Sequence, residues 1–252
     1  MNVRTLVVSD LHLGSRYTKA KEVSKLLSYI KCDTLILNGD IIDGWALKRG
    51  SSWKKEDMKC VRTIMKKSKK SKVYWIKGNH DDFLEDFIPF RIGNIEIKRD
   101  LFYEGINKKT YFVTHGDMFD VFVNDMKWLA KIGSLGYDLA LWLNKWYNKW
   151  RNWRGLPYFS LSKKIKDSVK MATSFIGEFE TFLISHTKAL MCGGVICGHI
   201  HCAKIESIDG IEYLNSGDWV ESMTALIEDH EGNWRIITYD ELLKLKSIPE
   251  NK

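Results

Sequence analysis

The chain has 252 residues, enough for one substantial domain or for one domain that carries an insertion. Its first apolar run, residues 6–8, is too short for a secretory signal, and no stretch approaches the roughly 18 apolar residues of a membrane-spanning helix. The five cysteines are odd in number and lie in predicted core segments, which predicts free thiols in a reducing compartment. We therefore expect a cytoplasmic globular protein.

The net charge of +7 is unevenly distributed along the chain. Eleven basic residues lie between Lys48 and Lys72 beside two acidic ones, and eight lie between Lys145 and Lys170 beside one. In the simplest interpretation, the first of these segments is a solvated helix face. The alternative is attraction of an anionic partner, which could be phosphate, nucleic acid or acidic lipid headgroups.

Three short apolar runs near the start of the chain predict buried strands, at residues 5–8, 34–37 and 72–76. The spacing of apolar residues predicts helices between them, at residues 18–30 and 53–70. A β-α-β-α-β order is typical of layered α/β folds, in which the site lies beyond the carboxyl ends of the strands. Polar residues follow each run at once, which is where that rule puts a site.

Further strands are predicted later in the chain, at residues 95–103, 111–114 and 194–197. Residues 204–240 predict two hairpins, because turn residues interrupt the apolar pattern at Asp209-Gly210 and at Glu231-Gly232-Asn233. These elements complete a mainly β core around the first three strands.

Residues 118–190 predict helices inserted into that core. Seven apolar residues share one stripe at three- and four-residue steps: Leu135, Leu139, Trp142, Leu143, Trp146, Trp150 and Trp153. Gly155 and Pro157 end this run, and a second helix is predicted to begin near Ser160 or Ser162. Two such helices are expected to pack as an antiparallel hairpin.

The helical segment also combines aromatic with basic residues. Packing against the core explains most individual rings. Taken together, Trp142 and Trp146 with Lys163, Lys164 and Lys166 suit an amphiphile with an acyl tail and a phosphate, or a membrane surface. Binding of single-stranded nucleic acid uses the same residue types and stays open as an alternative. These five residues are our candidate substrate contacts.

Seven potential metal ligands recur along the chain, each in a short block that follows a predicted strand. They are Asp10, His12, Asp40, Asn79, His115, His199 and His201. Five of the seven histidines of the chain fall within these blocks, which random placement would rarely produce. The mixed oxygen and imidazole set suits manganese, iron, zinc or cobalt.

The spacing of these residues predicts a site for two divalent cations. Alternate residues of a strand point to the same side, so a strand that ends in Asp-x-His is expected to aim Asp10 and His12 at one ion. We expect the first ion to be held by Asp10, His12 and His201, the second by Asn79, His115 and His199, and Asp40 to bridge them. Two cations about 3.5 to 4 Å apart hold the attacking and leaving oxygens of a phosphoryl group in line and acidify a bound water.

These blocks, in this order, resemble the calcineurin-like metallophosphoesterase superfamily. The resemblance implies an α/β fold of four layers, an αββα sandwich of two sheets flanked by helices. It also implies that the histidine of Gly78-Asn79-His80-Asp81 lies beside the metals as an acid. Carried over to this chain, His80 becomes the candidate proton donor or phosphate stabiliser and Asp43 the residue that orients its imidazole. Asp43 could instead be a helix N-cap or part of a surface turn.

A closer resemblance, over nearly the whole chain, is to UDP-2,3-diacylglucosamine hydrolases of lipid A biosynthesis. It rests on the length, the helical insertion after His115 and the block Leu214-Asn215-Ser216-Gly217-Asp218-Trp219. The resemblance implies a core of residues 1–117 and 191–252 with a helical cap at 118–190. It further implies manganese, a nucleotide-linked lipid substrate, and a position at the cytoplasmic face of the membrane. The better-known members carry arginine where this chain has His80, so the resemblance is to a related branch.

The expected reaction is therefore hydrolysis of UDP-2,3-diacylglucosamine to 2,3-diacylglucosamine 1-phosphate and UMP. A general phosphodiesterase that acts on nucleotides or nucleic acid is the first alternative. A non-catalytic binding protein on the same fold is the second, although such relatives are expected to lose ligands and none is missing here. Asp81 and Asp117 adjoin ligands and are expected either to hydrogen-bond to them or to cap helices.

Overall fold

The computed structural model describes the chain except for residues 123–148, 150, 152, 156–160 and 248–252. The described residues divide into two compact units. The first comprises Met1–Met118 with Leu183–Lys252, and the second comprises Phe119–Phe182. All seven expected metal ligands belong to the first unit, so its fold is what positions the site.

The larger sheet of the first unit has seven strands. In spatial order they are β12 (Trp234–Thr238), β11 (Thr224–Glu228), β1 (Asn2–Val8), β2 (Lys31–Asn38), β3 (Lys72–Ile76), β5 (Ile95–Lys98) and β4 (Phe90–Ile92). The strands β1, β2, β3 and β5 run parallel, as the β-α-β-α-β pattern predicted, and the others join antiparallel. The carboxyl ends of three parallel strands therefore lie at one edge, where the loops that carry the first ligands begin.

The smaller sheet has five strands. In spatial order they are β6 (Asp100–Glu104), β7 (Thr110–Thr114), β8 (Gly194–Cys197), β10 (Ile211–Asn215) and β9 (Lys204–Ile208). The strands β7, β8 and β10 are parallel, and the hairpins β9–β10 and β11–β12 confirm the two predicted for residues 204–240.

Apolar residues on alternate positions of the strands pack between the two sheets. Val7, Ile36 and Leu226 of the larger sheet form one buried cluster with Val113 and Ile196 of the smaller one. Their strand neighbours point the other way: Leu6 and Leu35, for example, belong to the cluster formed with the helices. This two-residue alternation is what makes each sheet one layer of a sandwich.

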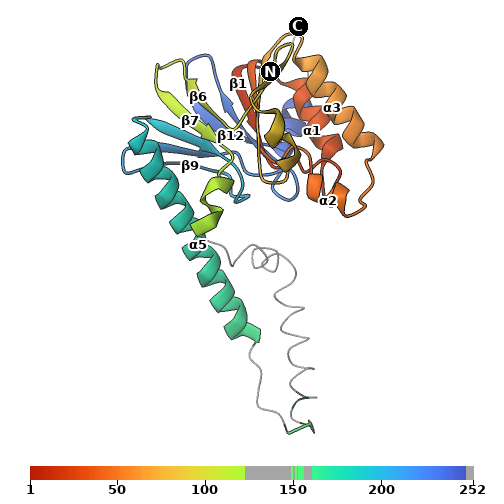
Figure 1. The fold of residues 1–252 in the computed structure, drawn as a ribbon, viewed down its shortest axis with the longest axis vertical. Coiled ribbons are helices and arrows are strands. Elements are labelled where there is room, and N and C mark those ends of the chain that lie inside the picture. Colours follow the sequence, from red (N-terminus) through yellow and green to blue (C-terminus); the bar gives the residue numbers. More distant parts are fainter. Residues whose placement is uncertain (123–148, 150, 152, 156–160, 248–252) are drawn as a thin grey trace. The chain divides into compact units, whose positions relative to one another are not determined.

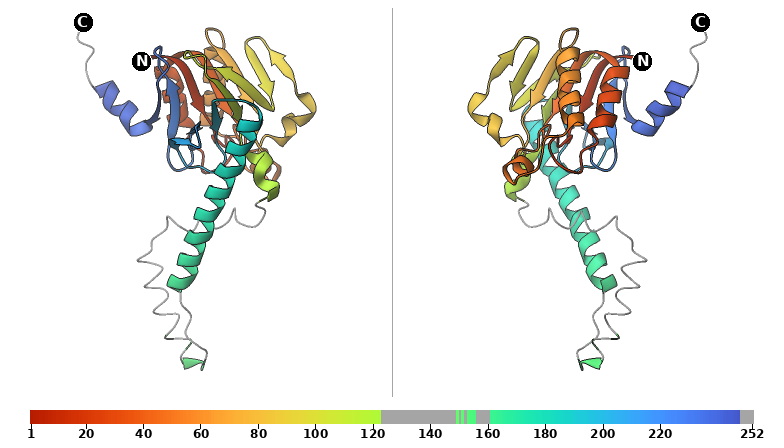
Figure 2. Two further views of the ribbon diagram at one scale, coloured as in Figure 1. Left: turned by 90° about the vertical axis from the view of Figure 1, so that its left-hand side faces the viewer. Right: turned by 90° about the vertical axis from the view of Figure 1, so that its right-hand side faces the viewer.

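Helices cover the outer faces of the sandwich. The helices α1 (Ala20–Tyr29) and α3 (Lys55–Lys67) lie side by side over the larger sheet (Figures 1 and 2). On the smaller sheet, His186 in the last turns of α5 (Leu161–Ala189) packs against Phe112 with ring centroids 5.4 Å apart. The predicted four-layer αββα class is thereby confirmed. The remaining described helices are short. They are α2 (Gly44–Lys48), α6 (Tyr239–Ser247), and the 3₁₀ helices η1 (Asp82–Phe87) and η2 (Asp117–Phe122).

The prediction of one strand at residues 95–103 was wrong. The chain forms β5 in the larger sheet, crosses over at Arg99, and continues as β6 in the smaller sheet. The alternation stops at the crossover, since Arg99 is exposed between Ile97 and Leu101, which are each buried within their own sheet. The charged run Lys98-Arg99-Asp100 was the available sign of a break. The short edge strand β4 was not predicted at all.

The second unit bears on the expected helical cap. The helix α5 begins at Leu161, as predicted near Ser160 or Ser162, and the rings of Phe119 and Phe179 meet edge to face. Most of the first predicted helix, including Trp142 and Trp146, lies outside the described residues. The cap and its boundaries at 118 and 190 stay predictions.

All five cysteines are free thiols, as expected, and four of them are buried. None of the described helices is long and apolar enough to cross a bilayer.

The packing between the sheets predicts a large difference between two leucine substitutions. Leu226 is fully buried between the sheets, whereas Leu243 in α6 is 43% exposed. We expect Leu226→Ala to lower the free energy of unfolding by about 2 to 5 kcal/mol, because a cavity replaces packed atoms. Leu243→Ala should change it by about 0.5 kcal/mol or less. Urea unfolding followed by circular dichroism measures both, and equal losses would contradict this account of the core.

Candidate metal centre

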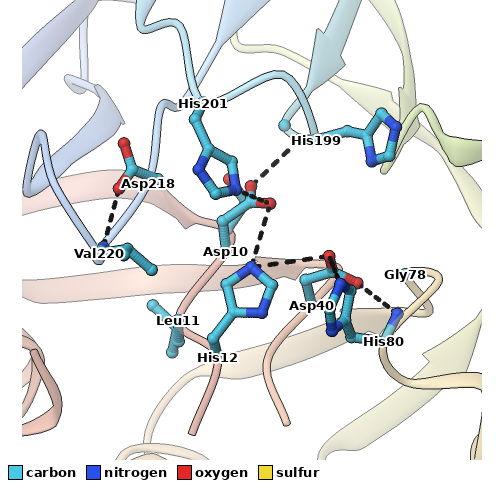
Figure 3. A network of polar contacts seen from close by, with 12 residues as sticks. Asp10, Leu11, His12, Asp40, Gly78, His80, His199, His201, Asp218 and Val220 are labelled. Carbon is cyan, nitrogen blue, oxygen red and sulfur yellow. Dashed lines mark hydrogen bonds and ion pairs between the residues drawn. The ribbon is translucent and has the colours of Figure 1, made fainter. Parts of the chain in front are cut away.

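The seven expected ligands all follow strand ends, and six of them, all but Asn79, bring their ligand atoms together in overlapping groups (Figure 3 labels Asp10, His12, Asp40, His199 and His201). Each comes from the loop that follows a strand: Asp10 and His12 after β1, Asp40 after β2, Asn79 after β3, His115 after β7, and His199 and His201 after β8. The loops after β1 and β2 are tied together by a parallel bridge between Leu13 and Ile42. The rule that sites in layered α/β folds lie beyond the carboxyl ends of the strands thus accounts for the position of these residues. The backbone conformation of some of them differs from the expectation.

The expectation that Asp10 and His12 lie on one face of an extended strand was wrong. The strand β1 ends at Val8, and both residues follow it in the left-handed region, with φ of 54° and 47°. Asp40, His199 and His201 are also left-handed, at 53°, 69° and 54°. Such residues are uncommon outside glycine, and they gather at functional sites because the surrounding structure maintains the strain. The side chains converge through these tight turns and not through strand periodicity.

The first group of ligand atoms is centred on Asp10. Its Oδ1 lies 3.2 Å from His201 Nε2 and 4.0 Å from His12 Nε2, while its Oδ2 accepts the backbone N–H of His199 at 3.1 Å. Asp10, His12 and His201 each offer one ligand atom within 4.8 Å of the others. The structure thus brings together the three residues expected to hold the first ion.

The second group is centred on Asp40. Its Oδ2 lies 3.3 Å from His115 Nε2 and 3.8 Å from His12 Nε2. Asp40, His115 and His199 form another set of ligand atoms within 4.8 Å of one another. A single carboxylate oxygen therefore faces histidines of both groups, which is the arrangement that a bridging ligand requires.

Three buried polar atoms in this centre have no hydrogen-bond partner of good geometry among the residues that the structure describes. They are Asp10 Oδ1, Asn79 Oδ1 and His115 Nε2. Each is a good metal ligand, and an unpaired buried polar atom costs about 1 to 3 kcal/mol. The donor set and these unpaired atoms together fit a pair of divalent cations, and Asn79 offers a buried amide oxygen from the loop whose Gly78 and His80 approach Asp40.

His80 lies on the open side of the centre and is paired with Asp43. Its Nδ1 lies 2.9 Å from Asp43 Oδ1, its Nε2 lies 4.0 Å from Asp40 Oδ2, and its side chain is 21% exposed. Asp43 Oδ1 also accepts the N–H of Ala46 at 2.8 Å and thereby caps α2. Both interpretations of Asp43 are therefore realised in one residue, because the helix cap holds the carboxylate in place to orient the imidazole.

The ring of Trp45 provides a second constraint on His80 that the sequence did not reveal. The two rings lie with centroids 4.2 Å apart and an interplanar angle of 35°. The ring of His12 meets the ring of His80 edge to face at 4.6 Å. A tryptophan two residues after Asp43 was the only sequence signal for this contact, and it is indistinguishable from a packing residue.

Asn38 fixes the orientation of His115, and it was also missed. Its backbone carbonyl accepts the Nδ1–H of His115 at 2.9 Å, so that Nε2 faces Asp40. The Asn38 side chain donates to the carbonyl of Thr114 at 3.0 Å and joins the ends of β2 and β7. A polar residue at the end of an apolar run, directly before Gly39-Asp40, was the available signal. Such hydrogen bonds fix the tautomer that binds metal.

Asp81 braces the loops and does not hydrogen-bond to a ligand side chain, contrary to one of the two expectations for it. It is fully buried and accepts the N–H groups of Ile41 at 3.1 Å, Ile42 at 2.9 Å and Gly78 at 3.3 Å. Burial and the nearby charge of Asp40 raise the pKa of the Asp81 carboxyl to about 7. The other expectation also fails, since Asp81 precedes η1 without capping it through its side chain.

The block at residues 214–219 braces the other side of the centre. Asn215 Nδ2 donates to the carbonyl of Gly198 at 3.0 Å, and Ser9 Oγ donates to the carbonyl of Gly217 at 2.8 Å. The N–H of Trp219 donates to the carbonyl of Asp10 at 3.1 Å. The block that carried the narrower resemblance therefore positions the loops after β1 and β8.

The two carboxylates and the histidines shift one another's pKa. Burial opposes ionisation of Asp10, but the imidazoles of His201 and His115 prevail and lower the pKa of its carboxyl to about 2. Burial likewise opposes the charge of His201, yet Asp10 raises its pKa to about 9. His115 behaves in the same way, because Asp40 and Asp10 raise its pKa well above the ordinary value.

The candidate substrate contacts are not placed by the structure. Trp142 and Trp146 lie outside the described residues, as do the side chains of Lys163, Lys164 and Lys166. The two remaining histidines lie apart from the ligand groups, since His186 packs on Phe112 and His230 is exposed.

A family model described as calcineurin-like phosphoesterase matches residues 3–203, which include every ligand loop. The chain belongs to the calcineurin-like phosphoesterase family. This membership confirms the broader resemblance and makes the protein a metal-dependent hydrolase, as expected. A comparison with curated proteins gave no match.

Solved structures resemble this chain at low sequence identity. A hypothetical protein from Pyrococcus horikoshii has 12% identity and a TM-score of 0.50, with 99% of this chain and 95% of that chain covered. An archaeal phosphodiesterase has 15% identity and a TM-score of 0.47, with coverage of 92% and 98%. A phosphoesterase from E. coli has 14% identity and a TM-score of 0.45, with coverage of 93% and 98%.

The raised pKa of His201 predicts that metal binding depends on pH. Below about pH 9 its imidazole carries a proton that an ion must displace. We expect the apparent affinity for Mn²⁺ to rise between pH 6 and pH 9, by about tenfold per unit for each proton displaced. Calorimetric titration in two buffers that differ in ionisation enthalpy measures the released protons. His201→Ala should flatten this dependence and the exposed His230→Ala should not; an affinity that does not change with pH would refute the prediction.

The glycines beside the ligands predict a second effect. A Cβ on Gly78 would lie 2.3 Å from Asp40 Oδ1 and 2.4 Å from Asp40 N, so the backbone of Asp40 would have to move. We expect Gly78→Ala to weaken metal binding and to lower turnover on the order of 100-fold. Gly177→Ala is the matched control, because its added Cβ would meet no described atom within 4 Å beyond the neighbouring backbone of its own helix. Metal content by mass spectrometry and hydrolysis of an aryl phosphodiester measure both, and equal behaviour of the two variants would contradict the close approach.

Proposed function

We propose that this phosphoesterase hydrolyses the pyrophosphate bond of a nucleotide-linked glycolipid, with UDP-2,3-diacylglucosamine as substrate and 2,3-diacylglucosamine 1-phosphate and UMP as products. The chemistry is carried by one observation, the carboxylate of Asp40 between two groups of histidine ligands. The substrate is supported by the resemblance of the ligand blocks and of residues 214–219. The aromatic and basic composition of residues 135–166 adds to that support.

The residues that would hold two ions are divided between the two groups. Asp10, His12 and His201 would hold one, His115, His199 and Asn79 the other, and Asp40 both. We propose manganese, to which carboxylate and amide oxygens are well suited, while the imidazoles also admit iron, zinc or cobalt. When bound, such ions polarise the phosphoryl oxygens and lower the pKa of a water.

His80 is the residue of the chain best placed to handle a proton. With its Nδ1–H donated to Asp43, its Nε2 is directed to the side of Asp40 on which a phosphoryl group would bind. When both ring nitrogens carry a proton, Nε2–H can donate there to an oxygen of the substrate, either to stabilise developing charge or to protonate the departing oxygen. Trp45 and His12 hold the ring from two sides, so that little reorientation is needed.

The same histidine favours a second candidate, a general phosphodiesterase. A departing phosphate, such as UMP, leaves readily as an anion, whereas a departing alkoxide requires a proton. An acid backed by a carboxylate is therefore of greater use in cleaving a phosphodiester than a pyrophosphate. The better-known lipid A hydrolases carry arginine at the position of His80, so the histidine of this chain favours the phosphodiester as the alternative substrate.

A lipid substrate also implies a location for the enzyme. We propose that the protein works at the cytoplasmic face of the membrane and reaches the lipid through residues 118–190. Trp142, Trp146 and the lysines at 163, 164 and 166 are the side chains proposed to contact acyl chains and phosphate. Nucleic acid is the less favoured partner, and we would expect it as a substrate only if the protein is a general phosphodiesterase.

The substrate proposal is tested by product release. The protein loaded with Mn²⁺ should release UMP from UDP-2,3-diacylglucosamine in mixed micelles. Trp142→Ala with Trp146→Ala should lower that rate by about tenfold or more, because buried aromatic contacts of the substrate are lost. Hydrolysis of a small aryl phosphodiester should hardly change. Cleavage of the aryl ester without any release of UMP would reject the glycolipid and favour the general phosphodiesterase.

A further inference from the structure

Only two of the basic residues in and around the helix α3 donate side-chain hydrogen bonds to other parts of the described protein. Lys54, at its N-terminus, donates to the carbonyls of Ser15 at 3.4 Å and Arg16 at 3.3 Å. Lys67, in its last turn, donates to the carbonyl of Leu27 at 3.2 Å and so completes the end of α1. These two lysines have structural roles that explain them.

The other basic residues of this segment have no such role. Lys55, Lys59, Arg62, Lys66, Lys69 and Lys70 are all exposed. None of the six forms an ion pair with any residue that the structure describes. Of the two acidic residues nearby, only Glu56 is exposed, because Asp57 is buried and accepts the N–H of Lys54 at 2.8 Å. A merely solvated face usually mixes both signs evenly, whereas this segment exposes six cations and one carboxylate.

Two apolar side chains lie within the same basic face. Met58 and Met65 are 42% and 46% exposed, and their separation of seven residues puts them on one side of the helix. They alternate with Lys55, Lys59 and Arg62 at helical spacing, while Cys60 and Ile64 point inward. The exposed face of α3 thus carries four of the six cations with two methionines beside them, and Lys69 and Lys70 continue it just past the end of the helix.

We propose that this face, formed by the six basic residues with Met58 and Met65, docks the protein on an anionic lipid bilayer. The charges suit lipid phosphate or carboxylate headgroups, and the methionines suit the boundary of the acyl chains. Nucleic acid fits less well, because α3 contains no aromatic side chain for base stacking. The proposal depends neither on the identity of the substrate nor on residues 119–182, since every residue of the face belongs to the first unit.

Vesicle sedimentation with the full chain tests the proposal. The probes are vesicles of phosphatidylcholine alone and vesicles that contain about 30% phosphatidylglycerol. The variant Lys59→Glu with Arg62→Glu and Lys66→Glu should lower partition onto the anionic vesicles on the order of 100-fold. The matched control, Lys31→Glu with Arg91→Glu and Lys108→Glu, makes the same change in net charge at exposed positions outside α3 and should lower it less than about fivefold.

The methionines are tested separately, with Met58→Gln and Met65→Gln. Binding that persists in high salt should fall by about tenfold in this variant, because the apolar contribution is unscreened. Unchanged thermal unfolding of all variants shows that the fold is intact. Equal losses in the two charge-reversed proteins, equal binding to neutral and anionic vesicles, or a preference for DNA over vesicles that α3 reversal removes would each overturn the proposal.

Discussion

Two buried carboxylates surrounded by imidazoles are the constraint on which the centre depends. Asp40 Oδ2 lies within 4.0 Å of nitrogens of His12, His80 and His115, and Asp10 is equally buried. Carboxylates removed from water need positive charge close by. Without ions, protons on the imidazoles provide it, which is why the pKa of His115 is raised. Bound ions would displace those protons and supply the positive charge themselves, so the negative charge of the carboxylates is compensated with or without metal.

Holding these groups so close requires a backbone that the sequence would not otherwise adopt. Five ligands have left-handed backbones, at about 1 to 2 kcal/mol each. Hydrogen bonds from outside the ligand set offset this strain. Asp81 clamps the loops after β2 and β3, and Asn215 and Trp219 secure those after β8 and β1. Gly39 lies where a Cβ would be 2.3 Å from the His115 ring, which explains a glycine before Asp40.

The sequence indicated which residues form the centre, because each polar block follows a buried apolar run and the carboxyl ends of parallel strands must meet. It could not reveal the turns that aim Asp10 and His12, since left-handed conformations of Asp and His have no pattern of their own. The crossover between Ile97 and Leu101 was missed for another reason: both residues keep the two-residue spacing of buried positions, and only the exposed Arg99 between them interrupts it. Asn38 was overlooked because it acts mainly through its backbone carbonyl, which any residue would supply.

The proposed docking face and the metal centre are two ends of one supersecondary unit. The strand β2 ends at the loop of Asp40, β3 ends at the loop of Asn79, and α3 belongs to the crossover between them. Cys60 and Ile64 fix α3 against the buried core, so its outer face cannot turn independently of the strands. If α3 docks as proposed, the bilayer orients the centre through packed side chains and not through a linker. A lipid held in that surface would then meet the ions at a constant angle, whatever its headgroup.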